Sequence, residues 1–280
     1  MDTWKAIRID LADYESAGEG ANGVSDNHRR DPDVMLKRYG AGVVPQPLDE
    51  MRIARKVFQA GIPTPEPGDD VTDGTRFGVR FGLIRDKVSY ARAVGDHPED
   101  VVRYAEEFAQ MCRRLHATHV DTALFECAKD RYARQLAENP FFTPAEKDRL
   151  LRFIQDAPDT DTAIHGDLQF GNAIFAGGKR YFIDLGDFCY GYPLFDIGMV
   201  YCTAYLSEPD FVREAFHMEP KTAVRFWQAF APVYFGTDRP LRDIESEVRP
   251  FAGLKTIIVE RDMGRPMPTL REALTSILQP

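Results

Sequence analysis

The residues best suited to chemistry lie near the middle of the 280-residue chain. The segment from His165 to Asn172 reads His-Gly-Asp-Leu-Gln-Phe-Gly-Asn, and Asp184 follows twelve residues later. Asp167 and Asn172 stand five residues apart in a stretch without helical periodicity, so we expect a loop. Carboxylate and amide oxygens are ligands for a hard cation such as Mg²⁺, which completes its shell with water and phosphate.

A predicted β-hairpin returns Asp184 toward Asn172. Two short strand-like runs flank Gly177-Gly178, a pair that favours a tight turn. Since a two-stranded ribbon brings its end back to its beginning, we expect Asp184 and Asn172 to share a cation. Asp167 is then left to orient a hydroxyl and accept its proton. Close positioning and charge neutralisation, with little covalent work by the protein, are what phosphoryl transfer requires.

Composition excludes several other classes of function. The chain carries 44 acidic and 35 basic residues, a formal charge of −9, which disfavours nucleic acid or an anionic membrane as partner and is compatible with a cationic substrate. No apolar run approaches the roughly 18 residues that span a bilayer, and the N-terminus lacks a signal-peptide pattern. The four cysteines lack metal-site spacing. We therefore expect a cytoplasmic protein, and the sequence carries no signal for its oligomeric state.

Periodicity divides the chain near residue 84 into two parts of an α+β protein. Residues 1–84 read as strands and turns with one helix, and residues 85–280 as mostly helical with one hairpin. The expected strands are 4–9, 34–39 and 77–84, and the expected helices cover 47–60 and 221–235 or begin near 98, 143 and 207. Apolar residues at 101, 105, 108, 112 and 115 form one helical stripe, and Thr143 with Glu146 is a capping box.

The central motif also carries a family resemblance. H-x-D-x-x-x-x-N followed by an aspartate after a hairpin resembles the catalytic and metal-binding segments of the protein-kinase-like superfamily. The forms H-G-D and I-D-L-G-D are similar to the aminoglycoside phosphotransferase and choline kinase families, most specifically over residues 164–197. The resemblance implies a bilobal protein-kinase-like fold with ATP bound between the lobes and GTP as an open alternative. Asp167 would be the catalytic base, and Asn172 and Asp184 would hold Mg²⁺.

Two features of the first part would bind the nucleotide on this resemblance. Gly18, Gly20 and Gly23 form a G-x-G-x-x-G whose following residues are polar, so a dinucleotide-binding helix is not expected. The segment is similar to the loop that covers the phosphates in kinases, although an ordinary turn has the same pattern. Leu83 and Ile84 would form the hinge between the lobes, whose backbone meets adenine.

A charged pair would complete the nucleotide site. Lys37 ends an apolar run, and the period of two puts it on the same strand face as Met35, from which it could neutralise phosphates. Arg38 is the competing assignment. By analogy with the kinase Lys–Glu ion pair, Glu50 on the predicted helix would pair with Lys37, with Asp49 as the alternative.

Three further residues receive supporting roles. On the resemblance, Asp196 supports the catalytic loop through hydrogen bonds without touching substrate. His165 is interpreted as bracing the loop backbone, because Asp167 already holds the position of the base. His116 stands at a predicted helix end, where a helix-dipole or capping role is the default.

We conclude that the sequence predicts a kinase for a small-molecule hydroxyl, such as that of an aminoglycoside, an amino sugar, a choline-like amine or another metabolite. A protein kinase is disfavoured because Gly166 replaces the arginine of H-R-D, and only eleven residues separate Asp184 from Asp196, too few for a long activation loop. A nucleotide-binding pseudokinase or scaffold is the non-enzymatic alternative, which the intact Asp167, Asn172 and Asp184 disfavour.

Overall fold

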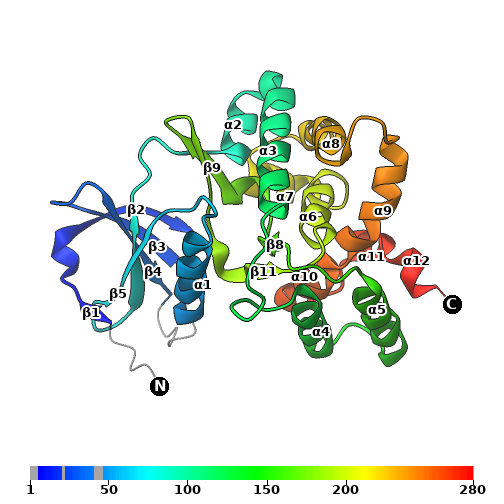
Figure 1. The fold of residues 1–280 in the computed structure, drawn as a ribbon, viewed down its shortest axis with the longest axis horizontal. Coiled ribbons are helices and arrows are strands. Elements are labelled where there is room, and N and C mark those ends of the chain that lie inside the picture. Colours follow the sequence, from blue (N-terminus) through cyan, green and yellow to red (C-terminus); the bar gives the residue numbers. More distant parts are fainter. Residues whose placement is uncertain (1–5, 21–22, 41–46, 280) are drawn as a thin grey trace. The chain divides into compact units, whose positions relative to one another are not determined.

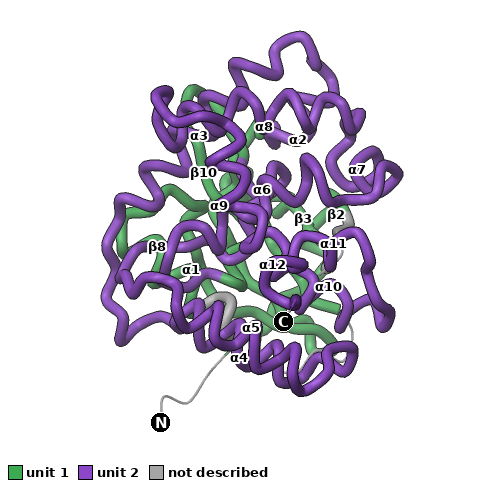
Figure 2. The backbone as a smooth tube through the Cα atoms, turned by 90° about the vertical axis from the view of Figure 1, so that its right-hand side faces the viewer, with its two compact units in different colours: residues 1–87, 174–187 green, residues 88–173, 188–280 purple. Residues whose placement is uncertain are grey.

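The computed structural model describes residues 6–20, 23–40 and 47–279. The chain divides into two compact units, which Figure 2 colours separately. The first unit is residues 1–87 with 174–187, and the second is residues 88–173 with 188–280. The central hairpin thus groups with the N-terminal sheet, whereas the division of the protein near residue 84 stays a prediction.

A six-stranded sheet forms most of the first unit (Figure 1). Its strand order is β1-β5-β6-β4-β3-β2, in which only the β1–β5 pair is parallel. The strands are β1 (Ile7–Arg8), β2 (Tyr14–Gly20), β3 (Gly23–His28), β4 (Val34–Tyr39), β5 (Pro67–Thr72) and β6 (Phe77–Gly82). The expected strand at 34–39 is confirmed, with Leu36 fully buried. The lysine next to Leu36 therefore projects from the opposite face, as alternation requires.

The first unit also contains one helix, α1 (Pro47–Gln59), which packs against its sheet. Ala54 and Val57 are buried, whereas Phe58 is 40% exposed and does not belong to the buried face. The helix ends at Gly61, whose φ of +77° is a conformation that glycine adopts without strain. The helix packs against β5, β6 and the short turn η4 (Leu185–Asp187), so it holds the segment that follows Asp184.

The hairpin of strands β9 (Ala173–Ala176) and β10 (Lys179–Phe182) is confirmed. Gly177 and Gly178 both have positive φ, 52° and 76°, as a two-residue hairpin turn of this type requires. The Phe182 N–H donates to the Pro63 carbonyl at 2.8 Å, which ties the strand before Asp184 to the rest of the first unit.

The second unit is mainly helical. Its helices are α2 (Tyr90–Asp96), α3 (Val101–His116), α4 (Ala128–Glu138), α5 (Pro144–Asp156), α6 (Leu194–Tyr205), α7 (Pro209–Phe216), α8 (Pro220–Phe235), α9 (Leu241–Gly253), α10 (Lys255–Met263), α11 (Pro268–Glu272) and α12 (Thr275–Leu278). Its strands are β7 (Val88–Ser89), β8 (Ala163–Ile164) and β11 (Cys189–Tyr190), and β8 pairs with β11 in antiparallel fashion. The sheet with one helix followed by a mostly helical part confirms the expected α+β class.

The core of the second unit forms around α3. All five positions of its predicted apolar stripe are buried, and α3 packs against α8 (Figure 1). The Phe108 ring contacts Phe170, Phe226 and Phe230, so the aromatic core reaches the turn that carries Asn172.

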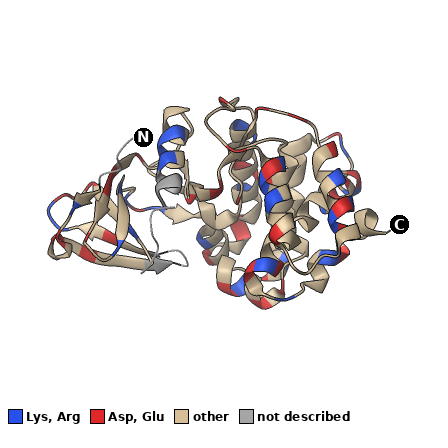
Figure 3. Cartoon of the chain, turned by 90° about the horizontal axis from the view of Figure 1, so that it is seen from below, with Lys and Arg blue, Asp and Glu red and all other residues tan. Residues whose placement is uncertain are grey.

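Two further features of the second unit are its predicted capping box and the distribution of its charged residues. The predicted capping box starts α5, with each partner bonded to the other's backbone. Lys and Arg as well as Asp and Glu are distributed over the helices (Figure 3). Among the described helices, none combines the length and the apolarity that crossing a bilayer demands.

Candidate active site

The loop that carries Asp167 is anchored on a buried carboxylate. Asp196 in α6 is fully buried, and its Oδ2 and Oδ1 accept the N–H groups of His165 at 2.7 Å and Gly166 at 2.8 Å. Gly166 has φ +84°, a conformation that favours glycine. These bonds confirm that Asp196 supports the loop backbone.

A buried histidine holds Asp196 from the other side. His116 Nε2 lies 3.1 Å from Asp196 Oδ2, and its Nδ1 lies 2.6 Å from the Tyr234 hydroxyl. Burial alone would raise the pKa of Asp196, but the hydrogen bond from His116 and the nearby His165 lower it below its usual value. A charged carboxylate only accepts, so Nε2 carries the proton. His116 does lie in the last turn of α3, as expected, but its ring contacts Asp196 and Tyr234, so the capping role was wrong. Its place one turn after buried Cys112 was the signal for a core role.

A buried lysine supports the same loop. Lys255 in α10 is buried, its Nζ donates to the Gly166 carbonyl at 3.1 Å, and it lies 5.8 Å from the centre of the Tyr132 ring. Burial alone would lower the pKa of Lys255, but Tyr132, Asp167 and Asp196 raise it above the usual value, so the amine stays charged. Sequence reasoning missed this residue, although a lysine inside the apolar run 251–258 was a visible signal.

The loop brings two of the predicted site residues together. Asn172 is buried, and its Nδ2 donates to both the main-chain carbonyl and the Oδ2 of Asp167, each at 2.9 Å. These bonds orient the Asp167 carboxylate and leave the amide oxygen of Asn172 as the atom that could bind a cation. The Asp167 N–H lies 3.4 Å from His165 Nδ1, in agreement with the bracing role expected of His165.

A second pair forms within the first unit. Lys37 Nζ lies 3.3 Å from Asp184 Oδ1, with the two side chains 19% and 40% exposed. Asp184 has φ +59°, a left-handed conformation unusual for a residue other than glycine, directly before η4. The competing Arg38 instead forms two hydrogen bonds with Asp26, at 2.6 and 3.0 Å. The structure thus pairs Lys37 with Asp184.

The predicted glycine loop and ion pair are only partly described. Gly18 and Gly20 end β2 and Gly23 begins β3, while Ala21 and Asn22 at the tip lie outside the described residues. A Cβ on Gly18 would meet no atom within 4 Å, so this side of the strand is open. The side chain of Glu50 also lies outside the described part of the chain, so its pairing with Lys37 stays a prediction.

The expected hinge has one of its backbone donors occupied. The Leu83 N–H donates to the Asp33 carbonyl at 2.7 Å, inside the first unit. If this segment contacts adenine, Leu83 can contribute only its carbonyl oxygen, and any main-chain N–H donor must come from Ile84. The role of both residues stays a prediction.

The donor set fits a magnesium ion. Asn172 offers an amide oxygen and Asp184 a partly exposed carboxylate, both hard oxygen ligands of the kind that Mg²⁺ selects. Among the described residues, no group of three or more His, Cys, Asp or Glu side chains could hold a metal. Asn172 and Asp184 belong to different units, so their convergence stays a prediction.

Comparison with known proteins identifies the family of this chain. The model of a family described as the phosphotransferase enzyme family matches residues 21–234, most of the chain. No curated protein matches the sequence.

Solved structures match along nearly the whole chain. Aminoglycoside phosphotransferase APH(4)-Ia, as a thermostable mutant with ADP and hygromycin B, is 12% identical over 94% of this chain and 90% of its own, with a TM-score of 0.61. A choline/ethanolamine kinase family protein from Mesorhizobium loti is 16% identical over 95% and 85%, with a TM-score of 0.56. Amicoumacin kinase hAmiN, in complex with AMP-PNP, Ca²⁺ and Ami, is 16% identical over 91% and 82%, also at 0.56. These matches confirm the kinase-like fold.

Proposed function

Because this chain belongs to the phosphotransferase enzyme family and is a small-molecule kinase, we propose that it moves the γ-phosphate of ATP to a hydroxyl group of its acceptor. The observation that carries the proposal is the orientation of the Asp167 carboxylate by Asn172, at 2.9 Å, on a loop anchored by Asp196. A carboxylate held in this way can align a hydroxyl for attack, which is the main task of a phosphoryl-transfer site.

Asp167 acts as the base. Asn172 occupies its Oδ2, so its other oxygen takes the proton of the acceptor hydroxyl. As that proton moves, the acceptor oxygen bonds to the γ-phosphorus and the bond to the β–γ bridging oxygen breaks. The products are a phosphate ester and ADP, and the proton stays on the Asp167 carboxylate until solvent removes it.

Lys37 supplies positive charge for the phosphates, and its contact with Asp184 at 3.3 Å supports its placement beside a metal ligand. Asn172 and Asp184 would hold Mg²⁺, which when bound neutralises phosphate charge. GTP in place of ATP stays open, because adenine recognition at Leu83 and Ile84 is itself a prediction.

The acceptor belongs to the hydroxylated amines and sugars. Structural relatives were solved with hygromycin B and with Ami, and a third carries the name of a choline/ethanolamine kinase family. The acidic charge of −9 supports a cationic acceptor of this kind for the present chain.

The test measures ADP release by the purified full chain with ATP and Mg²⁺ over a panel of aminoglycosides, amino sugars and choline-like amines. We expect acceptor-dependent turnover that Asp167→Ala lowers roughly a hundred- to ten-thousandfold, as loss of a general base does, while nucleotide affinity is kept. Asp148→Ala, an exposed aspartate on α5, is the matched control and should be fully active.

The scaffold alternative predicts a different result. Metal-dependent ATP binding without transfer to any acceptor, together with a nucleotide-bound structure in which the Asp167 carboxylate points away from the γ-phosphate, would establish it and refute an active kinase.

A further inference from the structure

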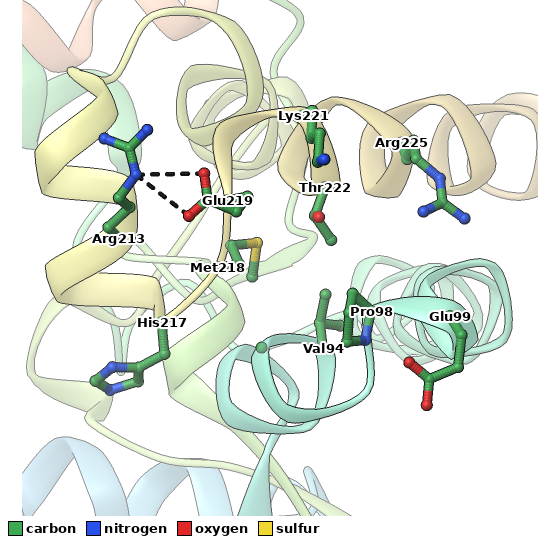
Figure 4. Close-up of a pocket in the computed structure, with 11 residues that line it drawn as sticks. Val94, Pro98, Glu99, Arg213, His217, Met218, Glu219, Lys221, Thr222 and Arg225 are labelled. Carbon is green, nitrogen blue, oxygen red and sulfur yellow. Dashed lines mark hydrogen bonds and ion pairs between the residues drawn. The ribbon is translucent and has the colours of Figure 1, made fainter.

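A cavity lies wholly within the helical unit, and neither Asp167 nor Asn172 lines it. It encloses about 630 Å³ between the end of α2, the short turn Pro98–Asp100 and the turn that joins α7 to α8 (Figure 4). Its size falls within the roughly 300–1,000 Å³ of small-molecule sites. We propose that this pocket binds a small anionic ligand through a carboxylate or phosphate group.

The pocket wall is fixed by a close backbone approach. A Cβ on Gly95 would overlap the His217 carbonyl oxygen, so only glycine lets α2 pack against the α7–α8 turn. His217 itself has a left-handed backbone with φ +56°, and the following Met218 is buried. The turn therefore has one well-determined conformation, as a preformed site requires.

Uncompensated positive charge lines the pocket from α8. Lys221 and Arg225 stand one turn apart on this helix and both line the cavity, and neither forms an ion pair with any described residue (Figure 4). Of the two acids that line the pocket, Glu219 is matched by a guanidinium, and Glu99 contacts a histidine that balances its charge only when protonated. Glu219 pairs with Arg213 at 3.3 Å, and Glu99 bonds a neighbouring histidine at 3.3 Å. The two α8 cations are thus left to attract an anion.

Thr222 adds a side-chain hydroxyl at the same place. Thr222 is only 4% exposed, and within the described residues its Oγ1 has no hydrogen bond. Figure 4 shows its side chain directed from α8 into the gap toward Val94 and Pro98. A ligand oxygen placed in the pocket would accept the Thr222 O–H.

The start of α8 adds a main-chain donor. Thr222 and Ala223 donate their N–H groups to the Glu219 carbonyl, and Pro220 has none. No described side chain caps the helix, so the Lys221 N–H remains without a partner in this part of the structure. A 16-residue helix carries partial positive charge at its N-terminus, which favours an anion there.

These donors select the class of ligand. A hydroxyl, a main-chain N–H, an ammonium and a guanidinium all give hydrogen bonds to oxygen, so the pocket favours a carboxylate or a phosphate over a cation. Carboxylate and phosphate ligands share this chemistry, and separate probes distinguish them.

The test is calorimetric titration of the full chain with inorganic phosphate and, separately, with succinate at low ionic strength. We expect one saturable site for at least one probe; the better probe identifies the ligand as a phosphate or a carboxylate. Thr222→Val should weaken binding roughly tenfold, since a hydrogen bond to a charged group is lost, and Thr222→Ser should restore it. The double variant Lys221→Gln/Arg225→Gln should weaken binding roughly a hundredfold or more by the same reasoning.

Two controls make the result specific. Lys37→Ala should leave the affinity unchanged, which separates this pocket from phosphate bound at the nucleotide residues. Arg152→Gln removes an exposed cation from α5 that forms no ion pair with described residues, and it should have no effect. The proposal is refuted if neither probe binds at tens of millimolar, or if the folded double variant binds as the wild type does. Because Lys221 and Arg225 are exposed, that variant should fold even where Thr222→Val does not.

Discussion

Substitution of Lys255 by methionine tests how the catalytic loop is held in place. Lys255 Nζ donates to the Gly166 carbonyl at 3.1 Å from a buried position. A hydrogen bond from a charged group contributes about 1.5–3 kcal/mol, and a methionine of similar length leaves that carbonyl without its donor. Loss of the buried charge offsets part of this cost. We expect the free energy of unfolding to fall by about 1–3 kcal/mol.

The effect on catalysis should be larger than the effect on binding. Gly166 precedes Asp167, so a shift of this backbone moves the proposed base relative to the acceptor hydroxyl. If most of the 1.5–3 kcal/mol is lost in the transition state, kcat falls roughly ten- to hundredfold. The KM for ATP should change less than about threefold, because the substitution does not touch the contacts that hold ATP equally well in the ground state and the transition state. Steady-state ADP release with the best acceptor measures both constants.

Lys129→Met is the matched control. Lys129 is also buried, and its Nζ donates to the Gln155 carbonyl at 2.8 Å and to Asp159 at 2.6 Å, away from the loop. This variant should lose comparable stability and keep its kcat. The reasoning is refuted if folded Lys255→Met keeps kcat within twofold of the wild type, or if both variants lose the same activity.

Three further substitutions test other contacts. Asp196→Asn should lower the free energy of unfolding by about 3–5 kcal/mol, since an amide offers one acceptor where the carboxylate serves three donors; chemical denaturation measures it. Burial alone would raise the pKa of Asp196, but His116 lowers it below its usual value. The contribution of charged Asp196 to the free energy of unfolding should therefore be present above about pH 4 and decline as the pH falls further. The wild type should therefore lose more stability than Asp196→Asn between pH 5 and pH 2, and equal losses would contradict the charged form. Lys37→Ala should weaken nucleotide binding roughly tenfold by removing a charge-assisted contact, and unchanged affinity by calorimetry would remove Lys37 from the site. Gly78→Ala should destabilise the first unit by about 1–3 kcal/mol, because its Cβ would lie 2.6 Å from the Lys37 carbonyl oxygen; a melting temperature equal to that of the wild type would contradict this.

Local signals in the sequence predicted the elements that position the site. The stripe of α3 is buried, the Thr143–Glu146 box starts α5, and Gly177-Gly178 turns the hairpin before Asp184. Each of these depends on residues within a few positions of one another, so a pattern reveals it. The strand that carries Lys37 follows the same logic, since alternation alone separates it from Leu36.

The support of the catalytic loop by two distant residues was not predicted, for a physical reason. His116 and Lys255 reach Asp196 and Gly166 across sequence separations of 80 and 89 residues. Such contacts arise from helix packing, which no local pattern encodes. The exposure of Phe58 has the same origin, because the width of a buried helix face is set by what packs on it.

The most direct test of the account is a crystal structure of the full chain with Mg²⁺, a non-hydrolysable ATP analogue and the acceptor. We expect an ion ligated by the Asn172 amide oxygen and an Asp184 carboxylate oxygen at about 2.0–2.1 Å, with the free Asp167 oxygen against the acceptor hydroxyl. An ion held by other residues, or Asn172 and Asp184 too far apart to share one, would contradict the account.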